Sequence, residues 1–175
     1  GATGAVGVEM IKTLERRRVP VGRLTLLASA RSAGRKLAFR DETLPVRELT
    51  PQSFVGVDYA LFSAGASTSR TAAPDAVKAG CIVVDNSSAF RMDERVPLVI
   101  PEINGQDIRG HQGIIANPNC TTAVTLMALY PLHQAFEVTR VFASSYQAVS
   151  GTGAKAIEEL ERQVSQIVAG QPAER

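Results

Sequence analysis

The feature that most constrains the fold is an alternation of short apolar runs with segments of helical periodicity. Apolar runs of strand length lie at 24–28, 57–62, 82–84 and 113–116, and helical patterns lie at 8–18, 72–79, 122–136 and 154–168. Strands that are apolar along their whole length are typical of a parallel sheet covered by helices on both faces. The sequence therefore predicts an α/β fold with a mostly parallel sheet.

Two further segments complete the predicted fold. Residues 37–49 alternate loosely around a turn at 41–42, which predicts a small hairpin. Residues 138–148 alternate apolar and polar side chains, as in a long strand with one face on an open sheet. This change of pattern near Cys120 predicts that a second domain begins there.

A glycine-rich turn, Gly-Ala-Thr-Gly-Ala-Val-Gly, occupies residues 1–7 and precedes the first helical pattern. Its spacing is G-x-x-G-x-x-G, which lets backbone N–H groups at a helix N-terminus approach a pyrophosphate, although glycine clusters also form ordinary turns. The helix and the apolar run that follow favour a dinucleotide site of the Rossmann type. Such a turn normally follows a buried strand, so we expect the chain to be a fragment that lacks this first strand.

The segment after the apolar run at 24–28 discriminates between the two nicotinamide dinucleotides. An NAD site places Asp or Glu there to bind the ribose hydroxyls. This chain has no carboxylate at 28–36 and offers Arg31 and Ser32, which can bind a 2′-phosphate. A solvated basic loop is the alternative interpretation, but the position after this strand favours NADP.

Cys120 lies between the apolar run at 113–116 and a helical pattern, in the sequence Asn-Pro-Asn-Cys-Thr-Thr. A helix N-terminus stabilises an anion, because its first N–H groups are unpaired and the macrodipole is positive there. A thiolate at such a position can act as a nucleophile. A free cysteine is more often a small core residue, but the flanking Asn and Pro residues are uncommon in a core strand.

Composition argues against several other functions. The net charge is +2, there is no tryptophan, and no basic run is interleaved with aromatic residues, so we expect no nucleic-acid partner. No apolar stretch approaches the roughly 20 residues that span a bilayer. The two cysteines have neither a disulfide framework nor a zinc-ligand spacing, and Cys81 opens an apolar run and is expected to pack in the core. We therefore expect a cytoplasmic protein without a metal site.

Several motifs in a fixed order closely resemble the aspartate-semialdehyde dehydrogenase family, and the resemblance runs along essentially all 175 residues. It implies NADPH-dependent reduction of L-aspartyl-4-phosphate to L-aspartate 4-semialdehyde with release of phosphate, a step in lysine, methionine and threonine biosynthesis. The motifs are the glycine turn at 1–7, Ser-Ala-Arg-Ser at 29–32, Leu-Phe-Ser-Ala-Gly at 61–65, Val-Asp-Asn-Ser-Ser-Ala-Phe-Arg at 84–91, Asn-Pro-Asn-Cys-Thr-Thr at 117–122 and Tyr-Gln-Ala-Val-Ser-Gly at 146–151.

The resemblance also implies a role for each matching residue. Cys120 would attack the acyl phosphate and form a thioester, which can accept a hydride. Asn119 and Arg91 would hold the departing phosphate, which suits a planar guanidinium, and Gln147 would orient the substrate. The residues expected to lie against the cofactor are Gly1, Thr3, Gly4, Ala5 and Val6 at the pyrophosphate, Arg31 and Ser32 at the 2′-phosphate, and Ser63, Ser150 and Gly151 elsewhere along it.

The same resemblance implies an NADP-binding Rossmann-type domain at 1–119 and the truncated start of an α+β catalytic and dimerisation domain at 120–175. It implies a homodimer or homotetramer at full length. In the family a general-base histidine and a substrate-carboxylate arginine lie further downstream. His111 and His133 match no family motif, so we expect them to be surface or packing residues and the chain alone to be catalytically incomplete.

Two alternatives remain open. N-acetyl-γ-glutamyl-phosphate reductase resembles the chain in architecture, but it typically has Gly where Asn119 stands and lacks the Ala-Val-Ser-Gly-Thr-Gly run at 148–153. The other alternative is a nucleotide-binding module without catalytic activity. The presence of Cys120, Arg91 and Gln147 together argues against an ancestral loss of catalysis, although truncation could produce it.

Overall fold

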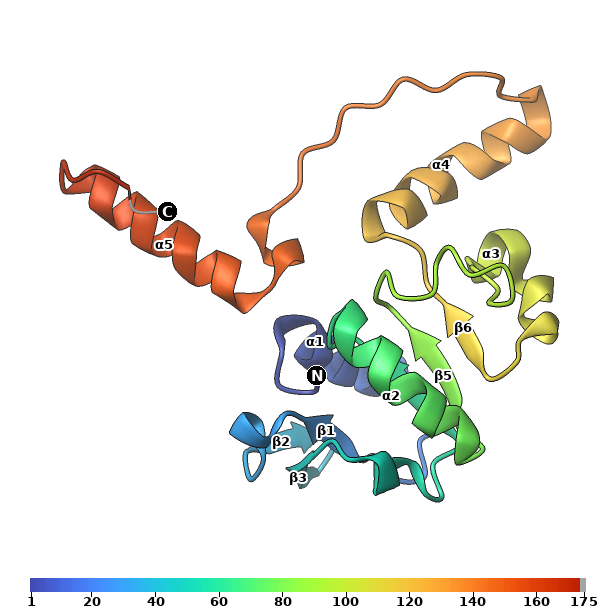
Figure 1. The fold of residues 1–175 in the computed structure, drawn as a ribbon. Coiled ribbons are helices and arrows are strands. Elements are labelled where there is room, and N and C mark those ends of the chain that lie inside the picture. The colour runs from blue at the N-terminus through green and yellow to red at the C-terminus, as the bar shows by residue number, and fades with distance from the viewer. Residues whose placement is uncertain (174–175) are drawn as a thin grey trace.

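A computed structural model describes residues 1–173 of the chain (Figure 1). Its first sheet has three strands in the order β1-β3-β2. β1 (Leu26–Ala28) pairs in parallel with β3 (Glu42–Glu48), and β3 pairs antiparallel with β2 (Lys36–Phe39). The hairpin predicted at 37–49 is therefore confirmed, and Arg40 and Asp41 form its turn.

The second sheet also has three strands, and all of them are parallel. Its order is β4 (Tyr59–Phe62), β5 (Ile82–Asp85) and β6 (Ile114–Ala116). The register aligns the last residues of the three strands at one edge of the sheet. Polar loops that follow these strands consequently meet at this edge, and the α/β fold class with its mostly parallel strands is confirmed.

The helix α1 (Ala5–Arg16) follows the glycine turn, as predicted. Its residue Ile11 is buried against the first sheet, because the apolar positions of the helix recur on one face. The core that it joins consists of Ile11, Leu26, Ala28, Phe39 and Val46.

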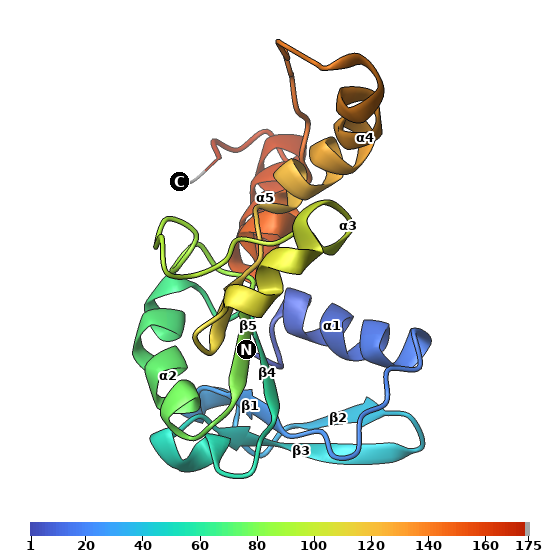
Figure 2. The same cartoon turned by 90° about the vertical axis from the view of Figure 1, so that its right-hand side faces the viewer.

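The helix α2 (Ala66–Lys78) begins at Ala66 and not at the predicted Ala72. The earlier start follows Gly65, whose φ of 88° lets the chain turn sharply after β4. Periodicity did not reveal the first turns, because residues 66–71 are mostly polar. In Figure 2, α1 and α2 lie on opposite faces of the second sheet. The core under α2 contains Phe54, Phe62, Ala72, Ala73, Ala76, Cys81 and Val83.

The segment between β5 and β6 is a long loop with little regular structure. The apolar residues at 98–100 contribute one isolated parallel bridge, between Leu98 and Ala116. A short helix, α3 (Pro101–Asn104), and a 3-10 helix (Gly105–Gly110) follow. The side chain of Asn104 closes α3 by accepting a 2.9 Å hydrogen bond from the N–H of Ile100.

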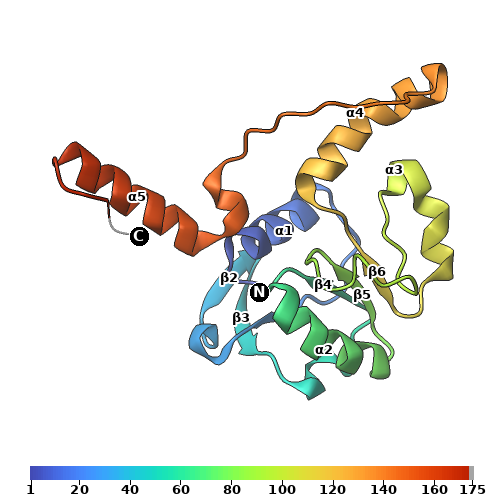
Figure 3. The same cartoon turned by 45° about the horizontal axis from the view of Figure 1, so that its top comes forward.

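Two long helices form the second half of the chain. The helix α4 (Cys120–Phe136) begins at Cys120 and not at the predicted Thr122, and α5 (Ala154–Val168) has the predicted bounds. A 3-10 turn (Val149–Thr152) precedes α5 and contacts it. Figure 3 shows that α5 points away from both sheets. Across residues 1–173, no helix combines the length and the apolar character needed to cross a membrane.

The prediction of a strand at 138–148 is wrong in this structure. Residues 137–148 form an extended connection without strand hydrogen bonds to any other part of residues 1–173 (Figure 1). A strand needs the N–H and C=O groups of a neighbour, and side-chain alternation alone does not supply them. The apolar side chains of this segment are exposed as a result, with Phe142 at 89% and Tyr146 at 100%.

Candidate functional site

Cys120 is the first residue of α4, and its side chain is exposed. Asn119 caps the helix, because its Oδ1 accepts hydrogen bonds from the N–H groups of Thr121 at 2.9 Å and Thr122 at 3.3 Å. This cap leaves the Asn119 Nδ2 amide as the group that can donate to an anion. The thiol therefore lies where helix geometry favours a negative charge.

Gln147 lies beside this thiol, although it is distant in sequence. Its Nε2 donates to Sγ of Cys120 at 3.7 Å, and its Oε1 accepts from Oγ1 of Thr121 at 3.4 Å. Gly151 lies against Gln147, because a Cβ on that glycine would collide with Nε2 of Gln147. The structure therefore brings the predicted residues Cys120, Gln147 and Gly151 together at the start of α4.

Arg91 lies at the edge where the parallel strands β5 and β6 end. Its Nε donates to the carbonyl oxygen of Asn117 at 2.9 Å, and its Nη2 donates to the carbonyl oxygen of Asn86 at 3.0 Å. Asn86 follows β5, and Asn117 follows β6. The guanidinium thus bridges the two strand ends within two residues of Asn119, and its remaining N–H groups are those that can bind an oxyanion.

The sequence interpretation missed the two asparagines that hold Arg91. Besides binding the guanidinium, Nδ2 of Asn117 donates to Oδ1 of Asn86 at 2.7 Å. A usable signal was present, since Asn117 directly follows one apolar run, Asn86 lies two residues after another, and the sheet was predicted to be mostly parallel. Parallel strands end at one edge of the sheet, so polar residues at their ends can be expected to meet.

The glycine turn is tightly folded before α1. A Cβ on Gly7 would collide with the carbonyl oxygen of Gly1 and lie 2.9 Å from Cα of Ala2, so only glycine fits there. A Cβ on Gly1 would lie 3.0 Å from the carbonyl oxygen of Ser63, which places that predicted residue against the turn. Gly4 is the N-cap of α1, and Ala5 and Val6 begin the helix with exposed side chains, while Thr3 is half-buried.

The structure separates the two residues predicted to bind a 2′-phosphate. Both lie in a 3-10 turn (Ala30–Ser32) directly after β1. Arg31 is exposed, whereas Ser32 is buried, with an exposed fraction of 9%. Arg31 is therefore the accessible group of the pair. The 3-10 turn that contains Ser150 lies near the N-terminal ends of α1 and α4 (Figures 1 and 3).

The two histidines lie away from the thiol. His133 lies thirteen positions after Cys120 along α4, which corresponds to about 20 Å at the helical rise. His111 precedes β6, and its Nδ1 accepts a 3.0 Å hydrogen bond from the N–H of Gly113. No hydrogen bond within residues 1–173 joins either histidine to the side chain of Cys120. Within residues 1–173, no group of three or more His, Cys, Asp or Glu side chains is arranged to hold a metal ion.

The second cysteine differs from Cys120 in its surroundings. Cys81 has an exposed fraction of 1% and packs in the core beneath α2, as predicted. Burial raises the pKa of the Cys81 thiol, and the carboxylate of Asp58 raises it further. Cys81 is consequently held as an uncharged, inaccessible thiol at neutral pH, which leaves Cys120 as the accessible thiol of the pair.

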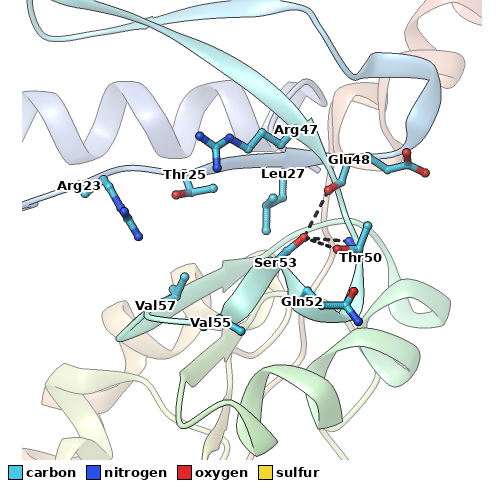
Figure 4. Close-up of a pocket in the computed structure, with 10 residues that line it drawn as sticks. All are labelled: Arg23, Thr25, Leu27, Arg47, Glu48, Thr50, Gln52, Ser53, Val55 and Val57. Atoms are coloured by element: carbon cyan, nitrogen blue, oxygen red, sulfur yellow. Dashed lines mark hydrogen bonds between the residues drawn. The ribbon is translucent and has the colours of Figure 1, made fainter.

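Two cavities of the fold lie apart from the predicted catalytic residues, although Val6, which is predicted to bind the cofactor, lines one of them. One cavity of about 280 Å³ lies between the first sheet and the start of β4 (Figure 4). Ser53 accepts a 2.9 Å hydrogen bond from the N–H of Thr50 in its wall and donates to the carbonyl oxygen of Glu48 at 3.3 Å. A second, apolar cavity of about 260 Å³ lies between α1 and Leu61. Cys120, Arg91, Asn119 and Gln147 line neither of these two cavities.

Two family models match the chain. The model described as semialdehyde dehydrogenase, NAD binding domain, matches residues 1–111. The model described as semialdehyde dehydrogenase, dimerisation domain, matches residues 129–175. Together they cover most of the chain, including the glycine turn and Arg91 in the first match and Gln147 in the second.

Individual relatives agree with these matches. The aspartate-semialdehyde dehydrogenase of Bacillus subtilis (strain 168) is 55% identical over 168 residues, which are 96% of this chain and 49% of the relative. The crystal structure of aspartate semialdehyde dehydrogenase II from Vibrio cholerae, complexed with ASA, has a TM-score of 0.96 at 44% identity and covers 100% of this chain and 53% of that one.

A more distant structure, aspartate semialdehyde dehydrogenase with NADP from Candida albicans, has a TM-score of 0.63 at 31% identity and covers 79% of this chain and 46% of that one. The chain spans about half the length of the relatives that it matches. From these matches and the order of its motifs, the chain belongs to the semialdehyde dehydrogenase family, and its relatives there are aspartate-semialdehyde dehydrogenases.

Proposed function

We propose that the protein containing this chain, at the full length of its relatives, reduces L-aspartyl-4-phosphate to L-aspartate 4-semialdehyde with NADPH and releases phosphate. The observation that carries the proposal is the arrangement around Cys120. The thiol lies at the start of α4 with the Gln147 amide 3.7 Å away, and Arg91 bridges the strand ends just before Asn119. A nucleophile, a substrate-orienting amide and a guanidinium for phosphate are thereby close together.

The proposed reaction uses Cys120 as the covalent catalyst. The thiolate attacks the acyl carbon of aspartyl phosphate, a C–S bond forms, and the C–O bond to phosphate breaks with the electron pair leaving on phosphate. Arg91 and the Asn119 amide stabilise the charge that develops on the phosphate oxygens. Gln147 donates to the substrate and fixes its orientation next to the thiol.

The resulting thioester must then be reduced. NADPH, when bound, supplies the hydride that converts the thioester to the aldehyde. The residues of this chain fit such a cofactor, because α1 begins directly after the glycine turn and the first N–H groups of the helix have no acceptor within it. Gly1, Thr3, Gly4, Ala5 and Val6 would bind the pyrophosphate, and Ser63, Ser150 and Gly151 would lie along the rest of the dinucleotide.

Arg31 is proposed to select NADPH over NADH. It is exposed after β1, at the position where an NAD site has a carboxylate. Replacing Arg31 with alanine is expected to raise KM for NADPH about tenfold or more, because one charge-assisted contact is lost, and to leave KM for NADH nearly unchanged. Arg35→Ala, a change of the same kind in the same loop, is the control. Equal use of both cofactors by the unmodified protein, with no effect of Arg31→Ala, contradicts this assignment.

We also propose how the full-length protein assembles, where its two domains meet and where in the cell it lies. The match of residues 129–175 to a dimerisation domain supports a homo-oligomer, a dimer or tetramer, at full length. We place the limit between the NADP-binding domain and the catalytic and dimerisation domain at residues 119 and 120, where α4 begins, and we propose a cytoplasmic location. The chain alone is proposed to be catalytically incomplete.

The proposed activity is tested by expressing the protein at the length of its relatives and following oxidation of NADPH. The expected result is turnover with aspartyl phosphate, and none with N-acetylglutamyl phosphate, which is the substrate of the main alternative. Turnover with N-acetylglutamyl phosphate alone would assign that activity instead. NADPH binding without turnover of either acyl phosphate would identify a nucleotide-binding module.

A further inference from the structure

The proposed chemistry leaves one buried acidic side chain without a role. Asp85 is the last residue of β5 and has an exposed fraction of 0%. Its Oδ1 accepts from Oγ of Ser69 at 2.7 Å and from the N–H of Ser87 at 3.2 Å, and its Oδ2 accepts from Oγ of Ser87 at 2.7 Å. A buried carboxylate is costly unless such donors satisfy it, so its presence at a strand end calls for a reason.

These hydrogen bonds connect Asp85 to two different parts of the fold. Ser69 belongs to α2, so its bond holds the carboxylate to the helix. Ser87 belongs to the loop that leads to Arg91, and its Oγ also accepts from the N–H of Ala89 at 3.1 Å. The carboxylate therefore fixes the first turn of this loop from inside the protein.

The position of this turn sets the position of a carbonyl oxygen that accepts a hydrogen bond from Arg91. Asn86 lies between Asp85 and Ser87, and its carbonyl oxygen accepts from Nη2 of Arg91. The backbone of Asp85 reaches the same place, because its carbonyl oxygen accepts from the N–H of Asn117 at 2.8 Å. The two carbonyl groups that hold the guanidinium are therefore both tied to Asp85. One belongs to Asn86, the next residue in the chain, and the other belongs to Asn117, whose N–H donates to the Asp85 carbonyl oxygen.

We propose that Asp85 is a positioning residue that acts through Ser87 and Asn86 to hold Arg91 in the geometry that binds phosphate. This inference rests on the proposed function, in which Arg91 binds the phosphate of the substrate. It assigns Asp85 no contact with substrate or cofactor. Its expected effect is on phosphate affinity, whereas a purely structural carboxylate would affect only stability.

The two serines provide matched variants for the test. Ser87→Ala and Ser69→Ala each remove one 2.7 Å hydroxyl hydrogen bond to the same carboxylate, so both are expected to lower Tm. Only Ser87→Ala loosens the loop that carries Arg91. In the full-length protein we expect it to raise KM for inorganic phosphate, in the reverse reaction with aspartate semialdehyde and NADP, by about threefold to tenfold. The reason is that the hydroxyl loses its hydrogen bonds with Asp85 and with the N–H of Ala89. Ser87→Thr, which keeps the hydroxyl, should restore most of the affinity, and Ser69→Ala should stay within about twofold.

A second measurement does not depend on turnover. Inorganic phosphate bound at Arg91 should protect the exposed Cys120 from alkylation by iodoacetamide, and Ser87→Ala should raise the phosphate concentration needed by the same factor. If the protein lacks the proposed activity but shows this protection pattern, the positioning role stands and the proposed function falls. Equal effects of the two serine variants, no effect of Ser87→Ala, or no protection of the unmodified protein would each overturn the inference.

Discussion

Replacing Cys120 with alanine is expected to abolish NADPH-dependent reduction of aspartyl phosphate by the full-length protein. The expected loss in kcat is on the order of 10⁴-fold or more, as when the nucleophile of a covalent mechanism is removed. The side chain is exposed at the helix terminus, so the substitution leaves no cavity in a packed core. Folding and cofactor binding should therefore be retained, which Tm and NADPH titration measure.

Cys81 provides the control for this prediction. It is also a thiol, but it is buried beneath α2. Cys81→Ala is expected to lower Tm, because a small buried group is removed from a packed core, and to leave kcat of the folded enzyme near that of the unmodified protein. Full turnover by Cys120→Ala, or loss of turnover with Cys81→Ala at unchanged Tm, is incompatible with Cys120 as the nucleophile.

Arg91→Lys is expected to lower kcat/KM for aspartyl phosphate by on the order of 10- to 100-fold, although the positive charge is retained. The planar guanidinium holds carbonyl oxygens at two strand ends through two of its N–H groups and offers the others to phosphate. A compact ammonium cannot serve both functions in a fixed plane. Steady-state kinetics with aspartyl phosphate, and with inorganic phosphate in the reverse direction, measure the effect.

Arg95→Lys is the matched control for this substitution. Arg95 lies in the same loop but pairs with Asp93 at 2.8 Å on the surface, where its hydrogen bonds hold the pKa of the Asp93 carboxyl at about 2. An exposed ion pair of this kind contributes little, so kcat/KM should change by less than about twofold. A comparable loss in both variants, or none in Arg91→Lys, would argue that Arg91 does not bind phosphate.

The sequence predicted the elements that have a strong local signal. The apolar run at 82–84 became β5, the hairpin at 37–49 formed, and α5 has the predicted bounds. Each of these patterns is decided by burial or turn chemistry within a few residues. The placement of Cys120 at a helix N-terminus also came from local signals, namely an apolar run before it, a helical pattern after it and the flanking Asn and Pro residues.

The remaining features depend on contacts between distant segments. Gln147 contacts Cys120 across 27 positions of the sequence, and Arg91 binds the carbonyl oxygen of Asn117 across 26 positions. The hydrophobic periodicity of a sequence gives no information on contacts between residues that are so far apart. The strand predicted at 138–148 failed for the same reason, because its pattern was correct for a strand but no neighbouring strand pairs with it in residues 1–173.

Mass spectrometry can detect whether Cys120 carries the substrate as a thioester. The full-length protein is incubated with aspartyl phosphate in the absence of NADPH, quenched in acid and digested. We expect one aspartyl group attached to the peptide that contains Cys120, and we expect it to disappear when NADPH is added before the quench. An active enzyme whose Cys120 peptide remains unmodified, or whose acyl group is attached to another residue, would contradict it.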